Sequence, residues 1–74
     1  MPEPTDQQIA HDAAAAAFSD SVKKATAQFY DCLITSAGDA QEIAGCKSRY
    51  ETALKTFKDG RQTSSSVVSE IFPQ

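Results

Sequence analysis

Apolar residues recur at alternating intervals of three and four along two long segments of the chain, with polar residues between them. The two stripes consist of Phe18, Val22, Ala25 and Phe29 in the first segment and of Ile43, Tyr50, Ala53 and Phe57 in the second. Because this spacing brings residues to one side of an α-helix, each segment is expected to form a helix that buries a narrow apolar stripe. The pattern predicts an all-α protein.

The expected ends of both helices carry residues that cap helices. Neither glycine nor proline occurs between Thr5 and Ala37, and Thr5 forms a capping-box pattern with Gln8. Gly38 can adopt the left-handed conformation that ends a helix, and the Asp39 carboxylate can cap the next helix. The sequence predicts helices over about residues 5–37 and 39–70, with short tails at 1–4 and 71–74.

So short a connection makes the two helices antiparallel neighbours in a hairpin, a single domain over residues 1–74. Folding about Gly38 and Asp39 opposes residues whose numbers sum to 78 or 79. This register predicts six layers: Cys32 with Cys46, Phe29 with Tyr50, Ala25 with Ala53, Val22 with Phe57, Phe18 with Gly60, and Ala15 with Ser64. It also extends the second stripe to Val67 and Ile71.

The sequence leaves the end of the second helix open. Gly60 and the serine-rich residues 63–66 favour a break, because they are poor helix formers. The apolar pattern resumes in phase at Val67, which favours a continuous helix. We favour the continuous helix, in which Gly60 packs beneath Phe18.

A second group of apolar residues lies beside the stripes and makes the apolar surface wider than two helices can cover. Its members are Ile9, Ala14, Leu33, Ile34, Leu54, Val68 and Phe72. A chain of 74 residues buries only about 60% of its unfolded surface, so its own core contributes little stability. We therefore expect a face for a partner helix or for a second hairpin in a four-helix bundle. The alternative is that these are separate exposed apolar residues, which ordinary surfaces contain.

The two cysteines, Cys32 and Cys46, fall in the same layer near the turn. The sequence favours a disulfide between them, which would close a loop of about 15 residues and contribute about 3 kcal/mol. The alternative is a pair of reduced cysteines that pack as small core residues. A disulfide implies export or an oxidising compartment, whereas free thiols imply the cytoplasm. The cysteine spacing matches no zinc motif, so no metal site is expected.

Composition and charge narrow the class of protein further. The chain is 41% hydrophobic and 23% charged with a net charge of −3, and its first residues are acidic. No apolar run approaches the length of a membrane span, so we expect a soluble protein without a span or a cleavable signal. Four lysines form a basic band around the middle of the hairpin: Lys23, Lys24, Lys55 and Lys58. Nucleic acid could use such a band, but the acidic balance and the Lys47–Glu51 spacing favour a solvated, salt-bridged surface.

No group of residues indicates catalysis. His11 is the only histidine, and neither His11 nor the serines at 64–66 have the partners of a catalytic constellation. We expect no enzyme activity and no cofactor. The leading hypothesis is a non-enzymatic helical interaction module, such as an accessory subunit, assembly factor or chaperone-like adaptor, that binds itself or another protein. The alternative is a small dimeric helical hairpin that binds nucleic acid through the basic band.

Overall fold

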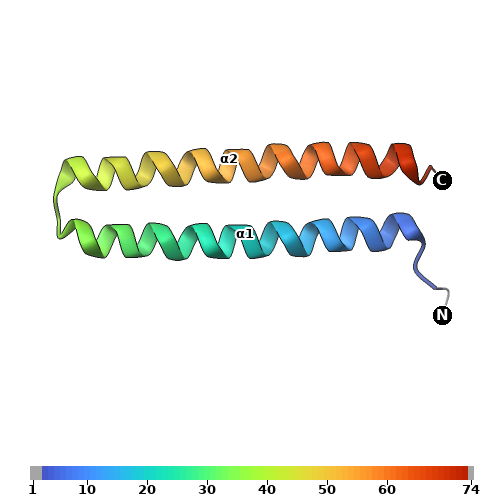
Figure 1. Ribbon diagram of the computed structural model, residues 1–74, viewed down its shortest axis with the longest axis horizontal. Helices are drawn as coiled ribbons and strands as arrows, with labels where there is room; N and C mark the ends of the chain where they lie inside the picture. The colour runs from blue at the N-terminus through green and yellow to red at the C-terminus, as the bar shows by residue number, and fades with distance from the viewer. Residues whose placement is uncertain (1–2, 74) are drawn as a thin grey trace.

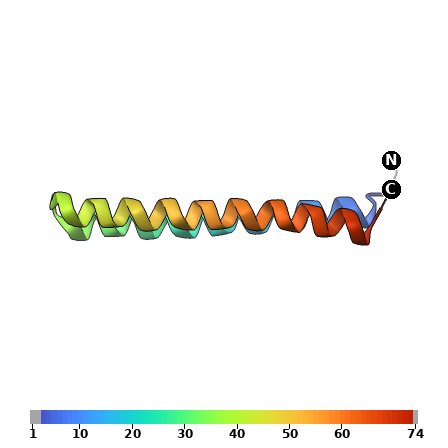
Figure 2. The ribbon, with the colours of Figure 1, turned by 90° about the horizontal axis from the view of Figure 1, so that it is seen from above.

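The computed structural model describes residues 3–73 and contains two helices, α1 (Asp6–Ser36) and α2 (Ala40–Ile71). They run antiparallel and side by side, with both chain ends at the same end of the molecule (Figure 1). The all-α hairpin predicted from the sequence is confirmed. Turning the molecule shows that the hairpin is one helix layer thick (Figure 2), with dimensions of 53 × 23 × 11 Å.

Both helix starts are capped as the sequence predicts. The Gln8 backbone N–H donates to Thr5 Oγ1, and the Thr5 N–H donates to Gln8 Oε1, each at 3.2 Å. At the start of α2, Asp39 Oδ1 accepts the N–H groups of Gln41 and Glu42 at 2.9 and 3.1 Å. These bonds satisfy N–H groups that have no partner within the helix, and they explain why the helices begin where they do.

The turn differs from the prediction by one residue. Ala37, not Gly38, is the C-cap of α1, with φ 49° and ψ 39°, and its N–H donates to the Ile34 carbonyl at 3.2 Å. Gly38 follows with φ 84°. Two successive left-handed residues reverse the chain within three positions, and the first of them carries a Cβ that makes this conformation unfavourable by about 1 kcal/mol.

The α2 helix continues through Gly60 and the serine-rich residues to Ile71, as predicted. Hydroxyl groups inside the helix bond to the carbonyl one turn back: Thr56 Oγ1 to Thr52 at 2.9 Å and Ser66 Oγ to Gln62 at 3.2 Å. These bonds satisfy the side-chain donors within the helix itself, so the hydroxyl groups do not compete for the N–H groups of the next turn. Residues that favour a break in isolation are therefore accommodated in one long helix.

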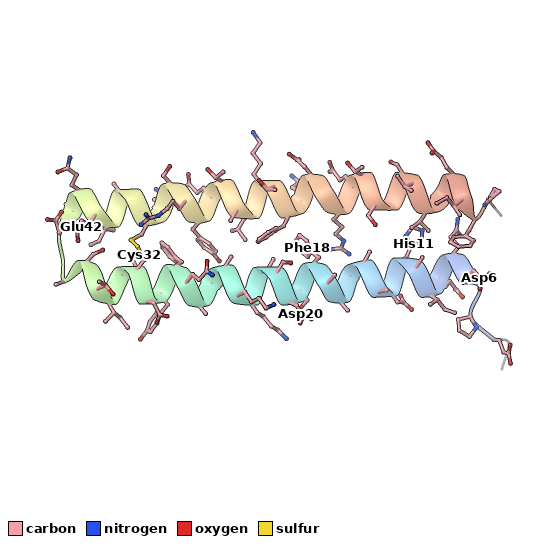
Figure 3. All side chains as sticks on the ribbon, in the orientation of Figure 1. Asp6, His11, Phe18, Asp20, Cys32 and Glu42 are labelled. Carbon is pink, nitrogen blue, oxygen red and sulfur yellow. A yellow bond between two sulfur atoms is a disulfide. The ribbon has the colours of Figure 1, made fainter. Side chains whose placement is uncertain are left out.

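The predicted packing of Gly60 beneath Phe18 is wrong. A Cβ built on Gly60 would meet nothing within 4 Å, so no neighbour requires a glycine there. The Phe18 ring is covered by the Arg61 guanidinium instead, whose carbon lies 5.0 Å from the ring centre, a cation–π contact. Figure 3 shows Phe18 on the inner side of α1, facing α2.

The apolar stripe of α2 also leaves the predicted path toward the C-terminus. Val67 and Ile71 are 43% and 63% exposed, whereas Ser64 and Val68 are half-buried. A straight helix has 3.6 residues per turn, so a seven-residue repeat drifts by about 20° with each heptad. From Cys46 to Val67 the repeat runs for three heptads. The accumulated drift turns Val67 outward and brings Val68 toward α1.

The core between the helices is thin. Among the described residues, the buried apolar side chains are those of Ala25 and Cys46, and no large side chain is fully buried. The other predicted stripe residues are half-buried: Phe18, Val22, Phe29, Ile43, Tyr50, Ala53 and Phe57. One layer of two helices covers only one side of each apolar stripe, so this result follows from the architecture.

Replacing Gly60 by alanine should raise the free energy of unfolding by about 0.5–1 kcal/mol. Alanine restricts the unfolded chain and favours the helix, and its methyl group has space here. Urea unfolding followed by circular dichroism at one protein concentration measures the change. Gly38→Ala is the matched control and should lower stability, because φ at Gly38 is 84°. A loss of stability in Gly60→Ala would mean that the glycine packs against a neighbour after all.

Candidate functional site

The end of the hairpin near the turn holds the two cysteines. Cys32 lies one turn before the end of α1, and Cys46 lies in the second turn of α2. Their sulfurs are at bonding distance as a disulfide, and their Cα atoms are 6.0 Å apart. This Cα separation is within the usual range for a disulfide.

Two polar side chains surround this sulfur pair. The Ser36 hydroxyl donates to the Cys32 carbonyl at 2.7 Å and lies 3.5 Å from Cys46 Sγ. The Arg49 guanidinium donates from Nη2 to Cys32 Sγ at 3.1 Å and lies 4.0 Å from Cys46 Sγ. Cys46 and Ser36 are 2% and 6% exposed, whereas Cys32 is half-buried and Arg49 is exposed. The site is therefore buried on the side of Cys46 and open on the side of Cys32.

Sequence reasoning found the cysteines but missed Ser36 and Arg49 as their neighbours. Ser36 follows Cys32 by four residues, and Arg49 follows Cys46 by three. Residues three or four apart lie on the same side of a helix, so these spacings were a usable signal. The long arginine side chain can reach across the pair, which spacing alone does not reveal.

An aromatic layer supports the cysteine layer. The rings of Phe29 and Tyr50 stack with centroids 4.5 Å apart and an interplanar angle of 11°. The Tyr50 hydroxyl is 2.7 Å from Thr26 Oγ1, so the polar end of the ring has a partner. The pairing of Phe29 with Tyr50 is the one that the predicted register gives. Together, the covalent bond, the stacked rings and the hydroxyl pair hold the helices in one register.

Three of the flanking apolar residues lie on a common side of the hairpin. Leu33 lies four residues after Phe29, and Leu54 lies four residues after Tyr50. Four residues turn the side-chain direction by about 40° around the helix axis, in the same sense in both helices. In an antiparallel pair this rotation leads to the same side of the molecule. Phe72 follows Leu54 by eighteen residues, about five full turns, so it also lies there.

Two stripe residues complete this side. Val22 precedes Leu33, and Ile43 precedes Leu54, by eleven residues each, which is about three turns. We call this set the apolar face: Val22, Leu33, Ile43, Leu54 and Phe72. Its first four members are half-buried and Phe72 is 36% exposed, so each still presents apolar surface to solvent.

The remaining flanking residues lie elsewhere. Ile9 is nine residues from Phe18 and Ile34 is nine from Ala25, about two and a half turns, so both lie on the outer side of α1. Their exposed fractions are 54% and 61%. Ala14 lines a shallow depression with Phe18, and Val68 is half-buried at the seam. The structure thus does not bring all seven predicted residues to one face.

The basic residues are exposed and lie in several directions. Lys23 and Lys24 are neighbours on α1 and therefore point about 100° apart. Lys55 and Lys58 are exposed on α2. The predicted pair of Lys47 with Glu51 is present as an exposed salt bridge with an Nζ to Oε1 distance of 3.9 Å. Such exposed pairs contribute little stability.

Two further properties concern the described part of the chain as a whole. Neither α1 nor α2 contains a stretch that is both long and apolar enough to span a bilayer. Within residues 3–73, no three side chains of His, Cys, Asp or Glu lie close enough together to hold a metal ion. His11 lies beside Ala14, Arg61 and Ser65 toward the open end of the hairpin, where Figure 3 labels it.

Reducing the disulfide should lower the free energy of unfolding by about 3 kcal/mol, because the bond closes a loop across the turn. Urea unfolding with and without a reducing agent measures this difference. The double variant Cys32→Ser with Cys46→Ser is the control: it should have the lower stability and no response to reductant. Equal urea midpoints for the wild-type chain in the two conditions would contradict the expectation.

The fold and the two candidate regions, the cysteine layer and the apolar face, come from this chain alone. Comparisons with protein-family models, with curated proteins and with solved structures find no match.

Proposed function

We propose that this protein is a non-enzymatic helical interaction module whose partner is a second copy of the same chain. Two hairpins would pack through the apolar face and form a four-helix bundle. The observation that carries the proposal is the size of the exposed surface of one hairpin.

A single hairpin exposes far more surface than a folded monomer of its mass. Its accessible surface is 5769 Å², whereas the scaling relation for monomers gives about 4,400 Å² for a mass of 7.9 kDa. Its radius of gyration is 17.0 Å, against about 11 Å for a compact domain of this length. Folded domains normally contain two packed layers of secondary structure, and the hairpin supplies only one.

The excess surface, about 1,350 Å², matches the needs of a dimer. A standard interface buries about 800 Å² on each partner, and permanent homodimers bury 1,000 Å² or more. The apolar face runs from Leu33 and Ile43 near the turn to Val22 and Leu54 at the middle of the hairpin, and Phe72 lies on the same side at the open end. A self-complementary contact along this face would cover both stripes at once, and twofold dimers are the commonest oligomers.

The charge of the chain is compatible with self-association. A net charge of −3 is small for 74 residues, so repulsion between two copies is modest at physiological salt. The nucleic-acid alternative gains no support from the directions of the lysines, because a run of phosphates needs cations on one side. We therefore retain protein association as the proposed function.

Light scattering coupled to size-exclusion chromatography tests the proposal at micromolar concentration. The expected mass is about 16 kDa, twice the 7.9 kDa of one chain. Leu54→Glu places a charge in the apolar face and should give the mass of a single chain, with helix content checked by circular dichroism. Ile34→Glu adds the same charge on the outer side of α1, where Ile34 is 61% exposed, and should remain dimeric.

A wild-type mass of one chain across this concentration range would contradict self-association. So would a dimer that both glutamate variants preserve, because the interface would then lie outside the apolar face. Measuring the same samples with added mixed-sequence RNA tests the alternative: binding that weakens steeply with salt would favour it.

A further inference from the structure

The two sulfur atoms of the disulfide differ in their access to solvent. Cys46 is 2% exposed and lies beneath the hydroxyl of Ser36. Cys32 is half-buried and lines two shallow depressions on the hairpin surface, one of which Cys46 also lines. Thiol–disulfide exchange requires an approach to one sulfur, and access decides which sulfur is attacked. Cys32 offers the more open approach, because it is the more exposed of the two cysteines.

The charged groups around Cys32 favour an incoming thiolate. The Arg49 guanidinium lies 3.1 Å from Cys32 Sγ and 4.0 Å from Cys46 Sγ. During exchange, negative charge spreads over the attacking, central and leaving sulfurs, and a neighbouring cation stabilises it. Asp31 and Glu42 line the same depression as Arg49, which is the only cation among its lining residues. Without Arg49, the two carboxylates would give the depression beside Cys32 a negative charge.

We propose that Cys32 is a site of S-thiolation by a low-molecular-weight thiol, with Arg49 as the positioning residue. The thiolate of the small molecule attacks Cys32 Sγ, a new S–S bond forms, and the Cys32–Cys46 bond breaks. Cys46 leaves as a thiolate and takes up a proton from solvent. The sulfur of the small thiol is oxidised from the thiolate to the disulfide level, and the Cys46 sulfur, which leaves with the electron pair of the broken bond, is reduced from the disulfide to the thiolate level.

Groups beside Cys46 can receive the leaving thiolate. The Ser36 hydroxyl, 3.5 Å from Cys46 Sγ, can rotate its proton toward that sulfur, and Arg49 is on its other side. A second thiolate could release Cys32 again, and reattack by Cys46 would restore the original bond. The asymmetry of burial thus assigns separate roles: Cys32 carries the adduct, and Cys46 is the leaving and resolving group.

The site of attack is tested with the oxidised full chain and 2-mercaptoethanol as the small thiol. Early samples are quenched with acid, free thiols are blocked with a maleimide, and fragment masses locate both modifications. The expected result is the mercaptoethanol adduct on Cys32 and the maleimide on Cys46. An adduct found mainly on Cys46, or equally on both cysteines, would overturn the proposal.

The role of Arg49 is tested by the initial rate of reduction at fixed pH and low salt. Arg49→Gln should slow the rate by about fivefold, the effect of one unit charge at about 4 Å in water. Arg49→Lys keeps the charge and should restore most of the rate. Arg61→Gln removes a charge elsewhere on α2, where Arg61 contacts Phe18, and should react as the wild type does.

Two outcomes would refute this role. Arg49→Gln could react as fast as the wild type, or Arg61→Gln could be slowed equally, which would indicate net charge alone. Unfolding of each variant in urea separates a change in chemistry from a loosened hairpin, because loosening would accelerate reduction and not slow it.

Discussion

The reversal of the chain at Ala37, Gly38 and Asp39 is the constraint on which the rest of the structure depends. The connection between α1 and α2 consists of two left-handed residues and an N-cap, with no further loop residues. This connection therefore sets which residues of α1 and α2 lie opposite each other. That register brings Cys32 to Cys46 and the Phe29 ring onto Tyr50. A longer loop would permit several registers, and a thin core could not choose among them.

Much of the architecture could be predicted because it follows from local chemistry. Caps at Thr5 and Asp39 act within one helix turn, and the cysteine pairing follows from counting outward from the turn. The sequence-based predictions are wrong where a small rotation per turn accumulates along a helix. They are also wrong where a long side chain can contact more than one neighbour. Val67 turns outward through the drift of a straight helix, and Arg61 covers Phe18 where a glycine was expected. Of the cysteine site, the sulfurs were predicted and Arg49 was not.

The single layer explains why the two functional proposals concern different parts of the surface. The side chains that hold the hairpin together are half-buried, so the same residues that fill the seam also extend toward solvent. The apolar face combines this exposure over the half of the hairpin near the turn, with Phe72 at the open end. At the cysteine site the exposure is confined to one layer, where Cys46 is buried and Cys32 is half-buried. In a thicker domain both features would disappear into the core.

The antiparallel pairing also implies an order of folding. Opposed residues are separated by 14 positions at the cysteines and by 65 where Gln7 Nε2 donates to the Phe72 carbonyl at 2.9 Å. Contacts near the turn close short loops, and each contact then shortens the loop that the next must close. Loop-closure entropy therefore favours a folding order that starts at the turn and proceeds toward the open end. The contacts at the terminal turns close the longest loops. These turns are therefore the first to separate in local unfolding.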